Sequence, residues 1–200
     1  YDAIGGSYFG DSISAKMFQK ELTALGKVDT INLRINSPGG DVFDGFAIYN
    51  QLKTHPAKVV VDVDGVAASI ASIIAMSGEQ IRMASNSMMM IHNPQGFAVG
   101  DEHEMARVQA LLKTIKGNLA DTYVTRTGNN KAQVEAWMQE ETWLTAEAAV
   151  QNCFADIVSD AIQVSACFDF KAFRNVPDTH TMLLDFICKY ACGQDSWRGF

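Results

Sequence analysis

The feature that most constrains the fold is a regular alternation of strand-like and helix-like segments over residues 28–92. Residues 28–36 (VDTINLRIN) alternate apolar and polar side chains as a half-buried strand does, and residues 58–65 (KVVVDVDG) are rich in β-branched side chains. Between them, residues 42–54 carry apolar side chains near helical spacing, and Pro56 closes that helix. Strands that are joined through a helix can lie parallel in one sheet, so the pattern predicts an α/β fold built from βαβ units.

The remaining elements follow from the same signals. Residues 69–78 are predicted to form a short buried helix, and residues 80–84 and 88–92 two short strands. Apolar side chains at helical spacing predict a long helix that begins with a capping box at Asp101 and ends at Gly128. Further predictions are a helix over 131–140, a helix begun by Thr145, a strand over 154–159 and helical turns around 181–192.

Composition and charge exclude some classes of partner. The chain of 200 residues is long enough for one domain with a buried core plus an appendage. Its formal net charge of −7 argues against nucleic acid and anionic membranes as main partners. No apolar run approaches the ~18 residues of a membrane span and no targeting segment is visible, so we expect a soluble cytoplasmic protein.

The four cysteines are Cys153, Cys167, Cys188 and Cys192, and they form no C-x-x-C pair. Cys188 and Cys192 are one helical turn apart with His180 upstream. Buried thiols, or thiols without a functional role, explain this spacing more simply than a zinc site does. We therefore expect neither a metal nor a cofactor.

The segment SPGGD (37–41) follows the first strand and combines residues with special backbone properties. Pro38 presets its own φ, whereas Gly39 and Gly40 accept backbone angles that other residues cannot. A loop of this kind can direct free N–H groups towards one point, as an oxyanion hole requires. A plain turn explains the same residues, and the motif taken alone favours that interpretation.

Ser69 lies in GVAASIAS (65–72), where a predicted strand passes into a predicted helix through mostly small side chains. A nucleophilic serine at such a turn benefits because the amides at and just after it point outward at the positive end of the helix. Small neighbours such as Gly65, Ala67 and Ala71 let the turn close tightly and let a substrate carbonyl approach. The alternative is a helix that packs closely against the sheet through small residues, and the stretch alone favours it.

His92 is the histidine that is placed like a catalytic base. It ends the apolar strand MMMIH, and sites in α/β folds usually form at strand ends, although a histidine on an apolar strand is more often a core residue. His55 and His103 lie at a helix end and in a charged helix turn, so both are predicted at the surface. Glu140 and Glu141 are candidates to orient the base, and Glu141 is the better one because Thr-Trp-Leu follows it into the core.

Together, four segments resemble the Clp protease proteolytic-subunit family, and within it the phage-encoded Clp-like prohead (head maturation) proteases. They are INSPGGDVFDGFAIYNQL, VDGVAASIASIIAMSG, MMMIHNP and ETWLTAEAAVQNCFADIV, in the family's order and with similar spacing. The resemblance covers roughly residues 1–160, which we expect to form the protease domain, and leaves residues 161–200 as a C-terminal extension of unknown role. It implies a crotonase-like ββα spiral with a protruding long helix, the handle that meets a facing ring.

The resemblance also implies the roles of individual residues. Ser69 matches the nucleophile of the family's G-x-(A/S)-A-S motif, and His92 matches the general base of its M-x-H-x-P segment. The family's oxyanion hole implies the main-chain amides of Gly40 and Ile70, with Gly39 shaping the loop.

Two departures from the family pattern bear on mechanism and assembly. Glu141 stands where classical subunits carry a catalytic Asp, three residues before Leu-Thr-Ala. Gln139 and Glu140 occupy the positions of an Asp-Arg pair that links stacked rings in classical subunits. We therefore expect a homo-oligomeric ring, without predicting a double heptamer.

The sequence thus predicts a serine endopeptidase that hydrolyses protein or peptide substrates by acyl transfer through a Ser-His-acid triad. Its partners would be capsid proteins in phage head maturation or, alternatively, an ATP-dependent unfoldase in general degradation. Three different functions compete with this prediction. A crotonase-type acyl-CoA enzyme would share the fold but rarely uses a Ser-His pair, a Ser-Lys peptidase would need a lysine near the site segments, and a non-catalytic scaffold is compatible with Glu141.

Overall fold

A six-stranded mixed sheet forms the centre of the fold in the computed structural model, which describes residues 2–5, 12–162 and 173–177. Its strands are β3 (Thr30–Ser37), β4 (Lys58–Ala68), β5 (Gln80–Ala84), β6 (Met88–Ile91), β7 (Thr142–Thr145) and β8 (Ile157–Ser159). The order is β7-β6-β4-β5-β8, and β3 pairs with β4 in addition. All of these pairs are parallel except β6 with β7, so the structure confirms the predicted α/β class with a mixed sheet, whereas the crotonase-like spiral stays a prediction.

The long strand β4 changes its neighbour halfway along its length. One edge pairs with β3 through residues 58–63 and again at Ala67, whereas the other edge pairs with β5 through residues 60–63 and with β6 through residues 66–68. The register with β3 shifts where this change occurs, and the buried Asn36 side chain accepts a hydrogen bond from the Val66 N–H (3.1 Å). The change of neighbour places the end of β4, and with it Ser69, beside the end of β6, after which His92 follows.

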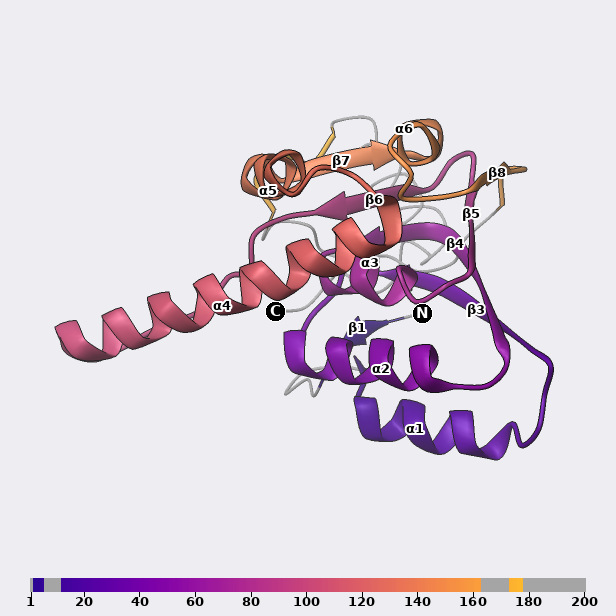
Figure 1. The fold of residues 1–200 in the computed structure, drawn as a ribbon, viewed down its shortest axis with the longest axis horizontal. Coiled ribbons are helices and arrows are strands. Elements are labelled where there is room, and N and C mark those ends of the chain that lie inside the picture. Colours follow the sequence, from indigo (N-terminus) through magenta and orange to yellow (C-terminus); the bar gives the residue numbers. More distant parts are fainter. Residues whose placement is uncertain (1, 6–11, 163–172, 178–200) are drawn as a thin grey trace, which may run out of the picture.

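Within the described ranges, six helices accompany the sheet: α1 (Ala15–Ala24), α2 (Val42–Thr54), α3 (Ile70–Ala75), α4 (Glu102–Thr127), α5 (Lys131–Glu140) and α6 (Ala146–Gln151). In Figure 1, α1 and α2 lie on one side of the sheet, with α1 outermost, and α5 and α6 lie near β7 on the other. The ends of α4 were predicted correctly because its capping residues act as expected, whereas α3, predicted to end at Gly78, ends at Ala75. Asp101 accepts hydrogen bonds from the N–H groups of His103 and Glu104, and Gly128 ends α4 with φ +72°.

The long helix α4 packs against the body of the protein only through its C-terminal half (Figure 1). Ile115, Leu119 and Tyr123 from the predicted apolar face are buried, whereas Met105 is 44% exposed. The first half of the apolar stripe therefore extends beyond the surface that the described residues of this chain cover. Whether this helix acts as a handle towards a facing ring stays a prediction.

Several short elements were not predicted from the sequence. They are α1, β7 and the two-residue strands β1 (Ala3–Ile4) and β2 (Ser12–Ile13). The two-residue strands are too short to show a period, and β7 is recognisable only through its pairing with β6, more than 50 residues earlier. The strand predicted over 154–159 begins only at Ile157, because Phe154 and Ala155 are buried in the turn that precedes it. The helical turns predicted around 181–192 lie outside the described residues.

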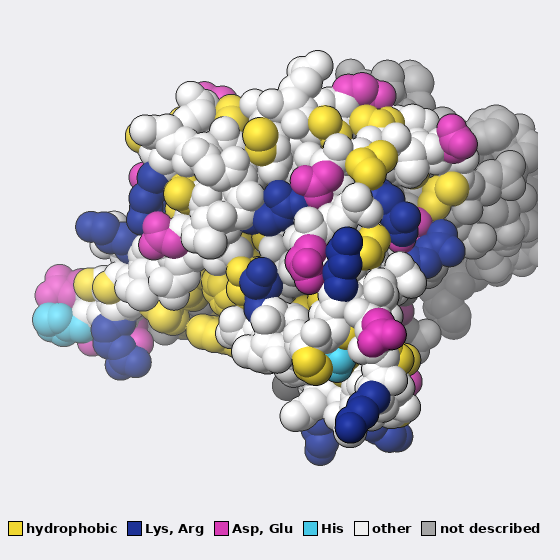
Figure 2. All heavy atoms as spheres, turned by 45° about the vertical axis from the view of Figure 1, so that its right-hand side comes forward, with side chains coloured by type: hydrophobic (Ala, Val, Ile, Leu, Met, Phe, Trp, Pro, Cys, Tyr) yellow, Lys and Arg dark blue, Asp and Glu magenta, His cyan; other side chains and the backbone are white. Residues whose placement is uncertain are grey.

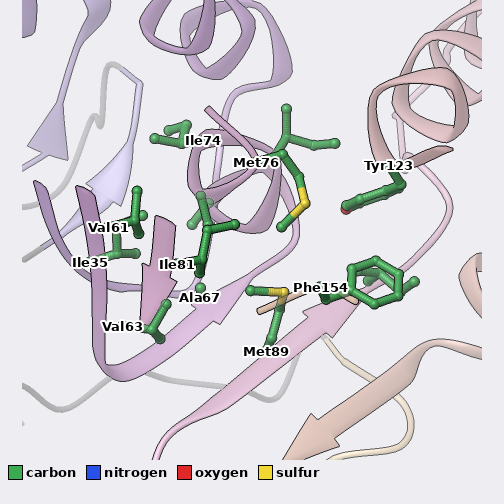
Figure 3. Close-up of a cluster of buried hydrophobic side chains, with 14 of the residues drawn as sticks. Ile35, Val61, Val63, Ala67, Ile74, Met76, Ile81, Met89, Tyr123 and Phe154 are labelled. Carbon is green, nitrogen blue, oxygen red and sulfur yellow. The ribbon is translucent and has the colours of Figure 1, made fainter. Parts of the chain in front are cut away.

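The hydrophobic core lies between the sheet and the helices. Figure 3 shows Val61, Val63 and Ala67 from β4 beside Ile81 and Met89 from the neighbouring strands, with Tyr123 of α4 and Phe154 closing one side. These fully or nearly fully buried side chains hold β4 rigidly beneath the turn at Ser69.

The surface carries charges of both signs. On the face drawn in Figure 2, acidic and basic side chains are interspersed. The ion pair between Arg82 of β5 and Asp62 of β4 (2.7 Å) joins neighbouring strands. Among the described residues, no helix has both the length and the apolar character that a membrane crossing requires.

Candidate active site

Ser69 sits at the junction of β4 and α3 in a strained backbone conformation. Its φ and ψ are 54° and −127°, and only two other non-glycine residues in the described ranges, Glu141 and Cys153, have positive φ. The Ser69 N–H donates to the Met90 carbonyl (2.9 Å), and the Ser69 carbonyl accepts from the Ser72 N–H (3.0 Å). Strain of this kind persists only where surrounding contacts enforce it, and it concentrates at functional sites.

The small residues around Ser69 serve both of the purposes considered from the sequence. Ala67 and Ala68 are fully buried between β3 and β6, and Gly45 of α2 lies so close to α3 that a Cβ there would approach Ile70 Cγ1 to 2.1 Å. Close packing of α2 and the sheet around the turn leaves the serine side chain itself partly exposed. The close-packing interpretation and the exposed-serine interpretation are therefore compatible.

His92 follows β6 and is brought to Ser69 across 23 residues of sequence. Its Nε2 lies 2.7 Å from Ser69 Oγ, within hydrogen-bond distance. Burial lowers the His92 pKa below its usual 6.5, an effect that Glu141 opposes and the Arg174 cation supports. The imidazole is therefore neutral near pH 7 and can accept the serine proton. By contrast, His55 and His103 lie elsewhere, at the end of α2 and in the first turn of α4.

The SPGG loop touches the serine turn directly. Gly39 has φ +97°, and a Cβ at this position would lie 2.7 Å from both the Ala68 carbonyl oxygen and Ser69 Cβ. Gly40, with φ +146°, forms a parallel bridge with Ile4: the Ile4 N–H donates to the Gly39 carbonyl, and the Asp41 N–H donates to the Ile4 carbonyl (both 2.8 Å). The unpredicted strand β1 thus holds the loop against the serine turn.

Two main-chain amides are available at this junction. Neither Gly40 N–H nor Ile70 N–H donates a hydrogen bond to another residue in the described part of the chain. The Ser69 N–H, which we also expected from the sequence to point outward, instead donates to the Met90 carbonyl and is not available to a substrate. Ser69, Ile70, His92 and the SPGG loop line one pocket of about 340 Å³, together with apolar side chains that include Val42, Leu119 and Phe173.

Glu141 is buried, with only 2% of its surface exposed, and it ends α5 in a left-handed conformation (φ 54°). Its carboxylate is close enough to His92 to raise the pKa of that imidazole. Among the described residues, however, its hydrogen bonds come from elsewhere: Oε1 accepts from the N–H groups of Arg174 (2.6 Å) and Asn175 (2.7 Å). The structure therefore places Glu141 at the site without a direct hydrogen bond to His92.

Other residues at the site were missed by sequence reasoning. Phe173 contacts the His92 ring edge-on, with 5.5 Å between ring centroids and 85° between ring planes. Tyr123 is buried in α4 and shares a 2.7 Å hydrogen bond with Ser72 Oγ, which donates to the Ser69 carbonyl (2.5 Å). The sequence gives no sign that either residue belongs to the site, because Phe173 lies in an irregular segment and Tyr123 is part of an ordinary apolar helix face.

The described residues contain no cluster of three or more His, Cys, Asp or Glu side chains that could hold a metal ion. Cys153 is exposed, and the other three cysteines lie outside the described residues. The functional groups described at the pocket are a hydroxyl, an imidazole, a buried carboxylate and two free main-chain amides.

A neutral imidazole bonded to a serine hydroxyl on a strained strand-to-helix turn is an arrangement that hydrolases use for nucleophilic catalysis. The mixed α/β fold and this pocket place the protein in that broad class. The chain belongs to the Clp protease family: the family model described as "Clp protease" matches residues 6–161. Membership of this family identifies the protein more narrowly as a peptidase.

Individual relatives agree with this assignment. The chain is 36% identical over 156 residues to "ATP-dependent Clp protease proteolytic subunit 1" of Protochlamydia amoebophila, covering 76% of this chain and 74% of the relative. The corresponding subunit of Chlamydia abortus is 34% identical over 139 residues, covering 67% and 71%. "ATP-dependent Clp protease proteolytic subunit" of Bacteroides fragilis is 29% identical over 153 residues, covering 74% of each chain.

Proposed function

We propose that the protein is a serine endopeptidase in which Ser69 is the nucleophile and His92 the general base. The observation that carries this proposal is the 2.7 Å contact between Ser69 Oγ and His92 Nε2, at a strained turn that opens into the pocket. Family membership supports peptide-bond hydrolysis as the reaction.

In the proposed reaction, His92 Nε2 takes the proton of Ser69 Oγ as the oxygen attacks the carbonyl carbon of a peptide bond. The tetrahedral intermediate collapses when His92 returns that proton to the leaving amine, and an ester to Ser69 remains. Water then attacks the ester, again losing a proton to His92, and the acid product leaves as Ser69 regains its proton. The lowered pKa of His92 suits the first step, because an imidazole that is already protonated could not act as the base.

The oxyanion of each tetrahedral intermediate needs hydrogen-bond donors. The N–H groups of Gly40 and Ile70 are unpaired among the described residues and flank Ser69 in the same pocket, so we assign them this role. Loss of one such donor typically costs ~3 kcal/mol of transition-state stabilisation. The negative charge of Glu141 would favour the imidazolium that forms during attack, through the electrostatic influence that also raises the His92 pKa.

The substrates we propose are proteins or peptides, and the working form a homo-oligomeric ring. Partnership with an ATP-dependent unfoldase is supported by the names of the relatives, which call them subunits of ATP-dependent proteases. Processing of phage capsid proteins is the other proposed role, and it rests on the sequence resemblance described above.

Labelling with a fluorophosphonate, which reacts with activated serines, tests the proposal. We expect a single adduct at Ser69, no adduct in Ser69→Ala, and loss of labelling in His92→Ala without loss of the fold. His103→Ala is the matched control, because His103 is exposed on α4, and it should label at the wild-type rate. A wild-type chain that forms no adduct would instead favour a scaffold or an acyl-CoA enzyme.

A further inference from the structure

A short segment beyond the family match lies against the active site. We call residues 173–177 (FRNVP) the strap. Phe173 and Val176, together with Trp143, pack against a small apolar cluster that is separate from the main core and is formed by Val66, Ala68 and Met90. Phe173 also meets the Trp143 ring edge-on, with 5.9 Å between centroids. The strap is therefore anchored on the ends of β4 and β6, the same strand ends that carry Ser69 and His92.

The strap supplies the hydrogen bonds that the buried carboxylate of Glu141 accepts. Two main-chain N–H groups converge on Glu141 Oε1, from Arg174 at 2.6 Å and from Asn175 at 2.7 Å. In addition, Asn175 Nδ2 donates to the Glu140 carbonyl (2.5 Å), which fixes the strap to the end of α5. No donor from residues 2–5 or 12–162 reaches this carboxylate.

This dependence matters because Glu141 is in an unfavourable position. It is buried, its backbone is left-handed, and its second oxygen, Oε2, has no hydrogen-bond partner among the described residues. A buried carboxylate that loses its donors bears the full cost of desolvation, so it would turn towards solvent or displace its neighbours. Without the strap, nothing in the described part of the chain would hold the acid beside His92.

The strap also forms part of the pocket. Phe173 lines the cavity of about 340 Å³ that contains Ser69 and His92, and its ring stands against the His92 imidazole. The remaining lining is largely apolar, with Pro38, Val42 and Leu119 among the contributors. An aromatic wall next to the reacting groups limits the size of the substrate side chain that fits there.

We propose that the strap is a working part of the active site, in which the amides of Arg174 and Asn175 position Glu141 while Phe173 positions His92 and sets substrate specificity. The substrates favoured by this pocket are peptides with a small or medium apolar side chain next to the cleaved bond. The specificity part rests on the proposed peptidase function, whereas the positioning of Glu141 does not.

Hydrogen exchange tests the link between the strap and Glu141 without requiring activity. In Glu141→Ala, the amides of residues 174 and 175 should exchange at least about fivefold faster than in the wild type, because their acceptor is gone. Glu140→Ala is the matched control, since it leaves both bonds to Glu141 intact, and strap exchange should stay at the wild-type rate. Equal exchange in all three proteins would overturn the positioning role.

Substitution of Phe173 tests the wall. In Phe173→Ala, labelling of Ser69 should slow by roughly tenfold, because a shift of the base by a fraction of an ångström already impairs catalysis. The ratio of kcat/KM for a peptide with a bulky aromatic residue to that for one with a small residue should rise by about tenfold or more. For both the labelling rate and the kcat/KM ratio, Phe173→Leu should lie between the wild type and Phe173→Ala. Phe97→Ala, at an 89% exposed position, should match the wild type in both.

These outcomes separate the two proposals. If wild-type Ser69 forms no adduct, the proposed function fails, and the hydrogen-exchange result still decides whether the strap holds Glu141. If the wild type is labelled but Phe173→Ala keeps both its labelling rate and its peptide preference, the specificity role is wrong and the serine peptidase stands.

Discussion

Replacing Gly39 by alanine should damage both the stability and the reactivity of the protein, although it adds a single methyl group. Gly39 is the point where the SPGG loop meets the serine turn. Its effect can be worked out from the structure, because the added atom has a defined position and defined neighbours.

Two penalties act at Gly39. Its φ of +97° is a conformation that L residues rarely adopt, which costs about 1–2 kcal/mol. The new Cβ would also lie 2.7 Å from Ser69 Cβ and 2.7 Å from the carbonyl oxygen of Ala68, the buried last residue of β4. Overpacking of this kind costs about 1–3 kcal/mol, so the free energy of unfolding should fall by about 2–5 kcal/mol.

The clash should also move the nucleophile. Because Ser69 Cβ is one of the two atoms in the way, relief of the clash displaces Ser69 Oγ from its 2.7 Å contact with His92 Nε2. A displacement of about 1 Å can cost roughly 100-fold in rate, so fluorophosphonate labelling should fall by that order. Denaturant unfolding and the labelling rate are therefore measured on the same variant.

Gly26→Ala is the matched control. Gly26 has φ +65° in the turn after α1, but a Cβ there would meet nothing within 4 Å. This variant should lose only the conformational part, about 1 kcal/mol, and should label at the wild-type rate. If Gly39→Ala unfolds and labels like Gly26→Ala, then the loop does not press on the serine turn, and our account of the site geometry is wrong.

Two further predictions concern the surroundings of the nucleophile and the base. Tyr123→Phe removes the hydroxyl that shares a hydrogen bond with Ser72 Oγ inside the core but leaves the hydrogen bond from Ser72 to the Ser69 carbonyl. The free energy of unfolding should therefore fall by about 1 kcal/mol, with little change in the labelling rate of Ser69. A large labelling defect would contradict this prediction. The activity should decline as pH falls through the His92 pKa, which burial lowers, Glu141 raises and Arg174 lowers. Glu141→Gln should therefore move this acid limb of the pH–rate profile to lower pH, and Arg174→Gln should move it to higher pH. The shift caused by Arg174→Gln should become smaller in high salt, because Arg174 is exposed. Shifts in the same direction would show that these charges do not act on His92 as described.

Much of the fold was predictable because its signals are local. The β-branched run of β4, the helical spacing of α2 and the caps of α4 at Asp101 and Gly128 all act over a few neighbouring residues, and the structure places these elements where the sequence predicted them. Ser69 and His92 were candidates because each lies at a predicted strand end, and the resemblance to the Clp family implied their roles. Their hydrogen bond was not visible locally, because it depends on the pairing of the end of β4 with β6.

The strap and the strand β1 show what a linear pattern cannot contain. Ile4 pairs with Gly40, and Arg174 and Asn175 bond to Glu141, over separations of more than 30 residues. The residue types involved carry no chemical signature, since the donors are main-chain amides that every residue except proline possesses. Local patterns along the chain indicated most of the longer elements, and sequence motifs nominated the serine and the histidine. The packing of distant segments decided which main-chain amides stayed free, which donate to other residues, and what surrounds the acid.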